Sequence, residues 1–253
     1  MGHRTGQSPL ELRLFRTVDH ECGYFPDRIA QDLVIDPQDP WLSERFRHAL
    51  GWGFRRSGNI VYRPDCATCH ACRPVRIPVA TFRPNRAQRR CLQRNASVDL
   101  RVCQAARTEE QFALYRKYLR ARHVAGGMDG HNELDFDQFL IGEWTDTKFL
   151  EMRENGQLIG VAVTDRVEDA LSAVYTFYDP DLDARSLGTY GILKQVELAV
   201  QEHLPYLYLG YWIENHPKMH YKRNFHGVET LFGRNWIPLA DMGAEVIVRG
   251  DES

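Results

Sequence analysis

The sequence predicts an α+β fold in which a mixed β-sheet is flanked by helices. Three observations support this class. Strand-like segments between residues 148 and 178 are joined by short turn signals, a helix-length segment with apolar spacing covers 186–203, and another apolar strand follows at 204–213. Strands that alternate with helices in this order are typical of a mixed α+β domain.

The first 100 residues or so are expected to be largely irregular, because Pro, Gly and Cys are frequent there. Trp41 to Leu50 predicts one helix in this region, and Gly51 would end it. Residues 60–62 and 75–79 predict two short strands, one on either side of a cysteine-rich loop.

Two further helices are expected before the strands of the sheet. Thr108 is a helix-start signal, and Glu109 and Glu110 follow in the first turn, where acidic side chains complement the helix dipole. This helix would run to the break at Gly126-Gly127. Residues 135–144 predict the second helix.

The segment from Lys148 onward predicts a three-stranded antiparallel meander. KFLEMRE alternates, Asn155-Gly156 is a strong two-residue hairpin signal, and QLIGVAVTDRV continues as a strand. Glu168-Asp169 turns the chain again into ALSAVYTFY, and Asp179-Pro180 ends the meander.

The last third of the chain predicts a helix, a buried strand, a short helix and one or two final strands. The first helix has apolar residues at helical spacing, namely Leu187, Ile192, Val196, Ala199 and Val200. LPYLYLGYWI predicts the buried strand, NHPKMHYKRNFHG the short helix, and VETLFGRNWIPL the last strands.

Positive charge is concentrated in one stretch of a nearly neutral chain. Residues 51–94 hold ten arginines, no lysine and one acid, Asp65, so they sum to 10 − 1 = +9 while the whole chain has a net charge of −2. Arginine suits bidentate phosphate contacts and base stacking, which favours nucleic-acid docking over a merely solvated charged face. The arginines best placed for this role are Arg83, Arg86, Arg89 and Arg90.

The stretch CATCHACRP places Cys66, Cys69 and Cys72 three residues apart. Together with Cys22, far upstream, they could supply four thiolates to a structural zinc ion or an iron–sulfur cluster. Reduced thiols packed in a core, or a redox switch, are the alternatives that the spacing leaves open.

No apolar run approaches the ~20 residues that a membrane span requires. The N-terminal stretch also lacks the apolar core and the small-residue cleavage site of a signal peptide. We therefore expect a cytoplasmic protein with reduced cysteines and no membrane partner.

The predicted order of elements resembles the acyltransferase fold with an N-acetyltransferase-like (GNAT-type) core. The resemblance divides the chain into a Cys/Arg-rich N-terminal region, residues 1–104, and an acyltransferase-like domain, residues 105–253. In that fold a glycine-rich helix start holds the coenzyme A pyrophosphate. Here Arg185 and Gly188 match this pattern, but Tyr190 stands where no side chain is wanted, so no coenzyme A is expected.

Three longer segments resemble the tRNA-dependent aminoacyl-protein transferases. Residues 53–90 match their N-terminal signature, residues 186–197 and 207–225 their C-terminal signature, and YLRARHVAGGMD fits the join. The compact length and the start CGYFPDR are similar to the bacterial aspartate/glutamate leucyltransferases. The resemblance covers nearly all of the chain, and its motifs are long and irregular.

This resemblance implies an enzyme that takes leucine from leucyl-tRNA and attaches it to proteins with N-terminal Asp or Glu, which marks them for degradation. Arginine transfer to the same acceptors is the nearest alternative, because both donors present the same tRNA end and ester. A non-catalytic, metal-bearing RNA-binding module is the alternative from another class. The reaction needs no Lewis acid, so we expect no cofactor to be required for catalysis and any metal to be structural.

The chemistry requires groups that hold the donor, read the acidic acceptor, move a proton and stabilise an oxyanion. Glu214 and Tyr221 are the candidate catalytic acid and base, with helix capping and core packing as their plainer roles. The remaining candidates for substrate binding are cations and polar or aromatic residues near the predicted site: Arg63, Arg76, Tyr175, Arg185, Asn215, Lys218 and Lys222.

Overall fold

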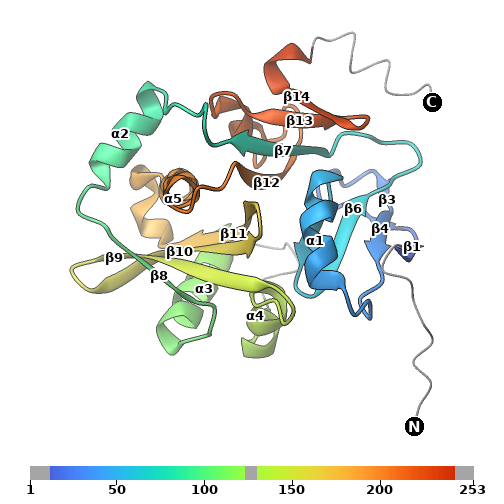
Figure 1. Cartoon of the computed structure of the whole chain (residues 1–253). Helices are drawn as coiled ribbons and strands as arrows, with labels where there is room; N and C mark the ends of the chain where they lie inside the picture. The colour runs from blue at the N-terminus through green and yellow to red at the C-terminus, as the bar shows by residue number, and fades with distance from the viewer. Residues whose placement is uncertain (1–11, 123–129, 243–253) are drawn as a thin grey trace.

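The computed structural model describes residues 12–122 and 130–242, and its centre is an eight-stranded sheet (Figure 1). The strand order is β14-β13-β7-β12-β11-β10-β9-β8. The bounds are β7 Arg73–Pro78, β8 Asp99–Gln104, β9 Asp146–Glu154, β10 Gln157–Val167, β11 Ala170–Tyr178, β12 Tyr206–Trp212, β13 Glu229–Phe232 and β14 Asn235–Pro238. The predicted α+β class with a mixed sheet and flanking helices is confirmed.

The predicted meander is formed by β9, β10 and β11, which pair antiparallel in sequence order. Asn155 and Gly156 both have positive φ, 51° and 84°, as a two-residue turn of type I′ requires. The next strand, β12, lies parallel to β11 but pairs only through Tyr206–Tyr208 with Ala170–Ser172. Beyond these residues the two strands separate toward their C-terminal ends.

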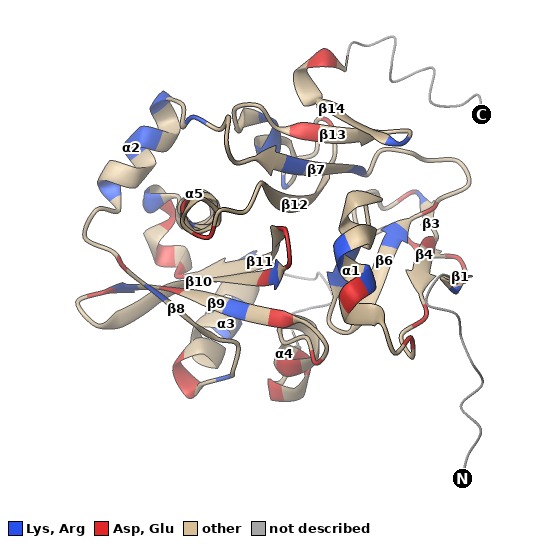
Figure 2. Ribbon diagram, viewed as in Figure 1, with Lys and Arg blue, Asp and Glu red and all other residues tan. Residues whose placement is uncertain are grey.

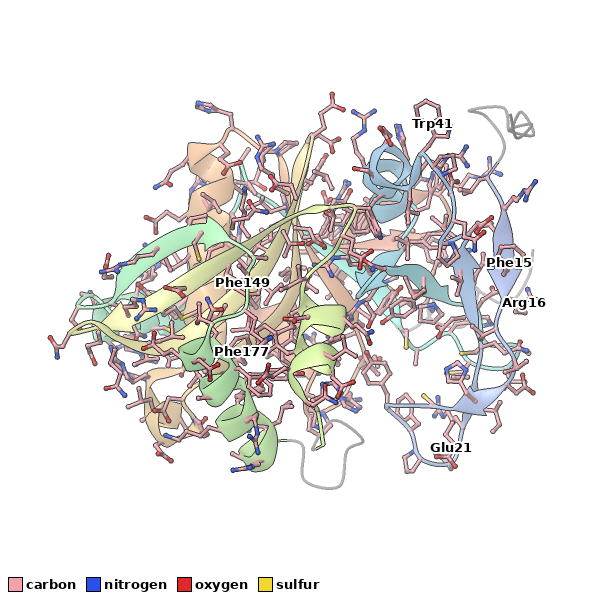
Figure 3. The ribbon with its side chains drawn as sticks, turned by 90° about the horizontal axis from the view of Figure 1, so that it is seen from below. Phe15, Arg16, Glu21, Trp41, Phe149 and Phe177 are labelled. Atoms are coloured by element: carbon pink, nitrogen blue, oxygen red, sulfur yellow. The ribbon has the colours of Figure 1, made fainter. Side chains whose placement is uncertain are left out.

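Helices cover both faces of the sheet (Figure 1). The crossover helix α5 (Leu187–Gln201) and α2 (Arg86–Arg94) lie on one side, and α3 (Glu109–Arg122) and α4 (Glu133–Leu140) on the other. Phe149 and Phe177 are fully buried and lie inside the molecule in Figure 3. Phe136 of α4 packs edge-on against both rings, with centroids 6.2 and 6.1 Å away.

A second, four-stranded sheet lies beside the first and is ordered β1-β4-β6-β5. Its strands are β1 Leu14–Arg16, β4 Asp32–Ile35, β5 Arg55–Ser57 and β6 Ile60–Pro64, and helix α1 (Leu42–Gly51) packs on it. Phe15 and Arg16 mark its outer edge in Figure 3, and Glu21 belongs to the small hairpin β2 (His20–Glu21) and β3 (Ile29–Ala30).

One buried ion pair joins the two sheets. Arg56 of β5 and Asp165 of β10 are 1% and 0% exposed, and Arg56 Nη2 donates to Asp165 Oδ1 at 2.6 Å. The same guanidinium donates to the carbonyls of Gly58 and Leu140 and to the Thr147 hydroxyl. The pair is thus fully hydrogen-bonded at the point where β5, α4 and the meander meet.

Several expectations for the N-terminal region are corrected by the structure. The region expected to be largely irregular contains β1 to β8, α1 and α2. Strands β7 and β8 lie before residue 105, yet β7 sits between β13 and β12 in the main sheet and β8 pairs with β9. The expected division at residue 104 therefore runs through one sheet.

Two predicted helices in the rest of the chain are shorter than expected. The helix expected over 135–144 spans Glu133–Leu140, starting from a capping box formed by Asn132 and Asp135. The short helix expected from Asn215 is a 3₁₀ turn, η2 (His220–Asn224), and Asn215 itself lies in the left-handed region with φ 56°. Two more 3₁₀ turns are η1 (Pro180–Arg185) and η3 (Leu239–Asp241).

Candidate active site

The separation of β11 and β12 opens the sheet beside the start of α5, and aromatic side chains line this opening. Tyr178 at the end of β11 lies against Gly188, where a Cβ would sit 3.4 Å from its ring. Tyr118 of α3 packs on Tyr178 and Tyr175, with ring centroids 5.0 and 6.2 Å away. Tyr190 points away from the opening, since it is 3% exposed and belongs to the core under α5.

Two hydrogen-bond donors face this end of the sheet. Burial and the neighbouring Tyr178 raise the pKa of Tyr221 to about 12, so its phenol stays protonated at neutral pH although 39% of the residue is exposed. The indole Nε1 of Trp212, at the end of β12, is buried and has no hydrogen-bond partner among the described residues. A buried donor left unpaired costs about 1–3 kcal/mol, so Trp212 Nε1 is available to a ligand.

Lys222, the residue after Tyr221, is buried. Its Nζ donates to the carbonyl of Tyr211 at 2.6 Å and lies 3.5 Å from Met219 Sδ. Burial lowers the pKa of Lys222 to about 7, and the positive charge of Arg55 contributes to this. Lys222 therefore changes its protonation state near neutral pH.

The N-terminal loop reaches the same segment of the chain. Tyr24 and Phe25 pack edge-on against His216, with ring centroids 5.6 and 6.0 Å away. Arg28 stacks on Phe25 and donates to Cys69 Sγ at 3.2 Å. The cysteine loop, the N-terminal loop and the segment after β12 therefore meet at one place.

The four predicted metal ligands lie in the same neighbourhood. Burial raises the pKa of the Cys72 thiol to about 12, and the nearby Cys22, Cys69 and Cys66 add to this effect. Within residues 12–122 and 130–242, however, no three His, Cys, Asp or Glu side chains are arranged to hold a metal ion. A zinc or iron–sulfur centre at these cysteines therefore stays a prediction.

Helix α2 carries the predicted nucleic-acid contacts and is fixed to the site at both ends. Asn85 and Gln88 both donate to the carbonyl of Asn224 in η2, and Asn95 donates to the carbonyl of Arg185 before α5. Four of its nine residues are arginines, and blue segments mark them on the ribbon in Figure 2. All four arginines predicted to contact tRNA are exposed: Arg83, Arg86, Arg89 and Arg90.

Two predicted substrate cations already have carboxylate partners. Arg76 Nε donates to Glu229 at 2.7 Å, and its guanidinium lies between the rings of Tyr206 and Trp236. Arg185 pairs with Glu154 at 2.5 Å. Substrate binding by Arg76 and Arg185 therefore stays a prediction for residues that already carry a counter-charge.

The other predicted residues are distributed around the site. Arg63 Nη1 donates to the carbonyl of Trp52, and Tyr175 is half-buried beside Tyr118. Glu214, Asn215 and Lys218 are exposed on the loop after β12. Glu214 is solvent-exposed because the chain leaves the sheet before this residue.

The comparisons with known proteins agree on one family. The family descriptions "Arginine-tRNA-protein transferase, N terminus" and "C terminus" match residues 20–90 and 110–232. The aspartate/glutamate leucyltransferase of Stenotrophomonas maltophilia (strain K279a) is 57% identical, covering 89% of this chain and 92% of that protein. That of Xylella fastidiosa (strain 9a5c) is 56% identical, covering 91% and 93%.

The chain belongs to the arginine-tRNA-protein transferase family. The two matched segments of this transferase contain the N-terminal loop, the cysteine loop, the first half of α2 and the whole of η2, which are the parts that meet at the site. Among solved structures, L-PGS from Bacillus licheniformis is similar with a TM-score of 0.43 and 11% identity, covering 69% of this chain and 51% of that chain. None of the described helices is long and apolar enough to cross a membrane.

Two residues that the structure places near the candidate site were not singled out from the sequence. Tyr118 was treated only as part of a helix, although its aromatic ring falls on the face that meets β11. Arg55 was counted only as one of ten arginines, although it packs against Gly210 of β12. A glycine inside a strand often marks such a close approach, and this was the available signal.

The capping box of α2 gives a first prediction for this transferase. The side chain of Asn85 accepts a hydrogen bond from the backbone N–H of Gln88, and the side chain of Gln88 accepts one from the backbone N–H of Asn85. We expect Asn85→Ala to lower the free energy of unfolding by about 1 kcal/mol and to weaken tRNA binding, because the first turn of α2 would fray. Urea denaturation and a tRNA filter-binding assay measure the two effects.

Asn132→Ala is the matched control, because Asn132 forms an equivalent capping box on α4, away from the arginines. It should cost a similar amount of stability and leave tRNA affinity unchanged. Equal losses of tRNA affinity in the two variants would contradict a specific role for α2.

Proposed function

We propose that this transferase moves leucine from leucyl-tRNA to the N-terminal Asp or Glu of acceptor proteins and so marks them for degradation. The observation that carries the proposal is the high identity, over about nine tenths of the chain, to proteins named aspartate/glutamate leucyltransferase. The exposed arginines of α2, which lie beside the opening in the sheet, support a tRNA donor.

The reaction is the aminolysis of an ester. The acceptor's α-amine, once neutral, attacks the carbonyl carbon of the leucyl ester and forms a C–N bond. The bond from that carbon to the terminal ribose oxygen breaks, the amine loses a proton, and the ribose oxygen gains one. An activated ester needs no covalent enzyme intermediate, so the protein's tasks are positioning, proton transfer and charge stabilisation.

The residues at the opening suit these tasks. Tyr221 is a protonated phenol and can donate to the leaving ribose oxygen. Trp212 Nε1 can donate to the oxygen that becomes negative during the attack, because no described residue accepts its hydrogen bond. Arg86, Arg89 and Arg90 would hold phosphates nearby, since α2 is bonded to the η2 turn that carries Tyr221. Glu214 stays a candidate for the general base, and its carboxylate is exposed to solvent.

The docking role of α2 predicts a change in salt dependence. The variant Arg86→Gln, Arg89→Gln, Arg90→Gln should bind leucyl-tRNA more weakly, and the slope of log affinity against log salt should fall by about 2–3, because each lost phosphate contact removes about 0.7–0.9. The control variant Arg16→Gln, Arg101→Gln, Arg166→Gln makes the same charge change on exposed strand positions. An equal fall in slope for both variants would show a general charge effect and contradict docking on α2.

The function itself is tested with matched donors and acceptors. The purified protein is incubated with leucyl-tRNA, arginyl-tRNA or acetyl-coenzyme A and with peptides that begin with Asp, Glu, Arg or Ala, and the products are analysed by mass spectrometry. Addition of leucine to the acidic peptides alone is the expected result. Addition of arginine would support the alternative donor, and no transfer from any donor would favour a binding module.

A further inference from the structure

Arg55 is enclosed by aromatic rings at the junction of the two sheets. It lies on β5, and the missing side chain of Gly210 makes room for it, because a Cβ there would sit 3.1 Å from Arg55 Nη1. The rings of Tyr62 and Tyr211 lie 5.8 and 5.7 Å from its guanidinium carbon. Gly210 has a φ of 69°, so the strand is shaped at this point for close approach.

Unlike its neighbours, Arg55 lacks a counter-charge. Arg56 pairs with Asp165 and Arg76 pairs with Glu229, but Arg55 makes no hydrogen bond or ion pair with any residue in the described part of the chain. The ionisable groups that act on it most strongly are the phenols of Tyr24, Tyr62 and Tyr211 and the thiol of Cys72. Burial raises the pKa values of Tyr24, Tyr211 and Cys72, so these three groups supply no negative charge at pH 7. The carboxylate of Asp32 is close enough to act on Cys72 and Tyr211, but its partner is His20, whose Nε2 lies 3.5 Å from Asp32 Oδ2.

A second cation stands beside Arg55. The amine of Lys222 is buried and has no carboxylate partner among the described residues, and Arg55 is the charge that acts on it most strongly. Keeping positive charge on the half-buried Arg55 and the buried Lys222 without an anion is costly in free energy, because water is partly removed and no opposite charge replaces it. An arrangement of this kind is typical of a ligand site, where the ligand supplies the negative charge.

We propose that Arg55, together with Lys222, binds the side-chain carboxylate of the acceptor's N-terminal Asp or Glu. This inference rests on the proposed function and names the residue that sets acceptor specificity. A carboxylate fits better than a phosphate, because a planar guanidinium between ring walls matches the two oxygens of a carboxylate, while the exposed arginines lie outside on α2. Lys222 follows Tyr221 directly, so a carboxylate held here places the acceptor's α-amine near the opening in the sheet.

The test compares Arg55→Met and Arg55→Lys with the wild-type protein on peptide pairs that differ only in charge, Asp against Asn and Glu against Gln at the N-terminus. Transfer rates with leucyl-tRNA and direct binding of the peptides without tRNA are both measured. For Arg55→Met we expect kcat/KM on acidic peptides to fall at least about 30-fold, with the Asp/Asn preference close to one and the affinity for tRNA unchanged. Arg55→Lys should keep part of the preference, since it keeps the charge but not the paired N–H donors.

Arg16→Met is the matched control, because Arg16 lies on the same sheet with 61% of its side chain exposed. If circular dichroism shows that Arg55→Met does not fold, the Asp/Asn preference is measured with Lys222→Met in its place. An unchanged Asp/Asn preference in the folded variants overturns the proposal, and so does a loss confined to tRNA binding. If the wild-type protein transfers no leucine, the proposed function fails, while the peptide-binding measurement still decides whether Arg55 reads the carboxylate.

Discussion

Replacing Asp165 by asparagine should lower the free energy of unfolding by about 3–5 kcal/mol, because it leaves the guanidinium of Arg56 buried without its counter-charge. Both side chains are fully enclosed, and Asp165 also accepts a hydrogen bond from Thr147. The damage should reach beyond the pair, since the same guanidinium holds the carbonyls of Gly58 and Leu140. Chemical denaturation followed by tryptophan fluorescence measures the loss.

Two further variants show whether charge burial is the cause. Arg56→Met with Asp165→Leu removes both charges and should recover much of the lost stability, because an apolar pair of similar size has no desolvation penalty. Glu168→Gln breaks the exposed pair between Arg47 of α1 and the turn after β10, and should change stability by less than about 1 kcal/mol. A loss as large for Glu168→Gln as for Asp165→Asn would contradict this account.

The second large effect is on the pH dependence of stability. Lys222→Met should raise the free energy of unfolding at pH 6 by about 2–4 kcal/mol. The folded protein holds the pKa of Lys222 at about 7 against an ordinary value of 10.5, a difference worth about 5 kcal/mol, and the variant also loses the bond to the Tyr211 carbonyl.

The sign of this effect changes with pH. Below about pH 7 Lys222 is protonated in both states, and the folded state bears the full cost of the buried charge. Between about pH 7 and 10.5 only the unfolded chain holds the proton, so wild-type stability rises with pH and the advantage of Met shrinks. Paired denaturation curves at pH 6 and pH 10 measure this. A constant difference between the proteins, or the same trend in the exposed Lys218→Met, would contradict it.

Much of the fold follows from local patterns in the sequence. The hairpin at Asn155-Gly156 and the apolar spacing of α5 depend on neighbouring residues only, and both predictions are confirmed. Helix α2 is less clearly marked, because four of its nine residues are arginine and it buries only Gln88 and Cys91. The strands of the smaller sheet are short, with three to five residues each, so alternation of apolar residues hardly marks them.

The site was less predictable, because its properties come from contacts between distant parts of the chain. Lys222 was among the predicted residues, but its burial depends on Met219 and on the carbonyl of Tyr211. Arg76 and Glu229 lie 153 positions apart, so no local pattern shows that they pair. Whether an arginine is paired, stacked or free depends on such contacts, whereas composition gives only the number of arginines.

The position of β7 has a consequence for how the protein assembles. This strand is made early, yet its two neighbours in the sheet, β12 and β13, come from the last part of the chain. Pairings across such long loops form slowly, because the entropy of closing the loop is lost before the contacts are gained. During synthesis β7 has no partner strands until β12 and β13 have left the ribosome. The pairing of β7 with β12 and β13 should therefore be a late step of folding. An incomplete chain that lacks these strands should not yet bring Arg55, Lys222 and Tyr221 into the arrangement proposed for the site.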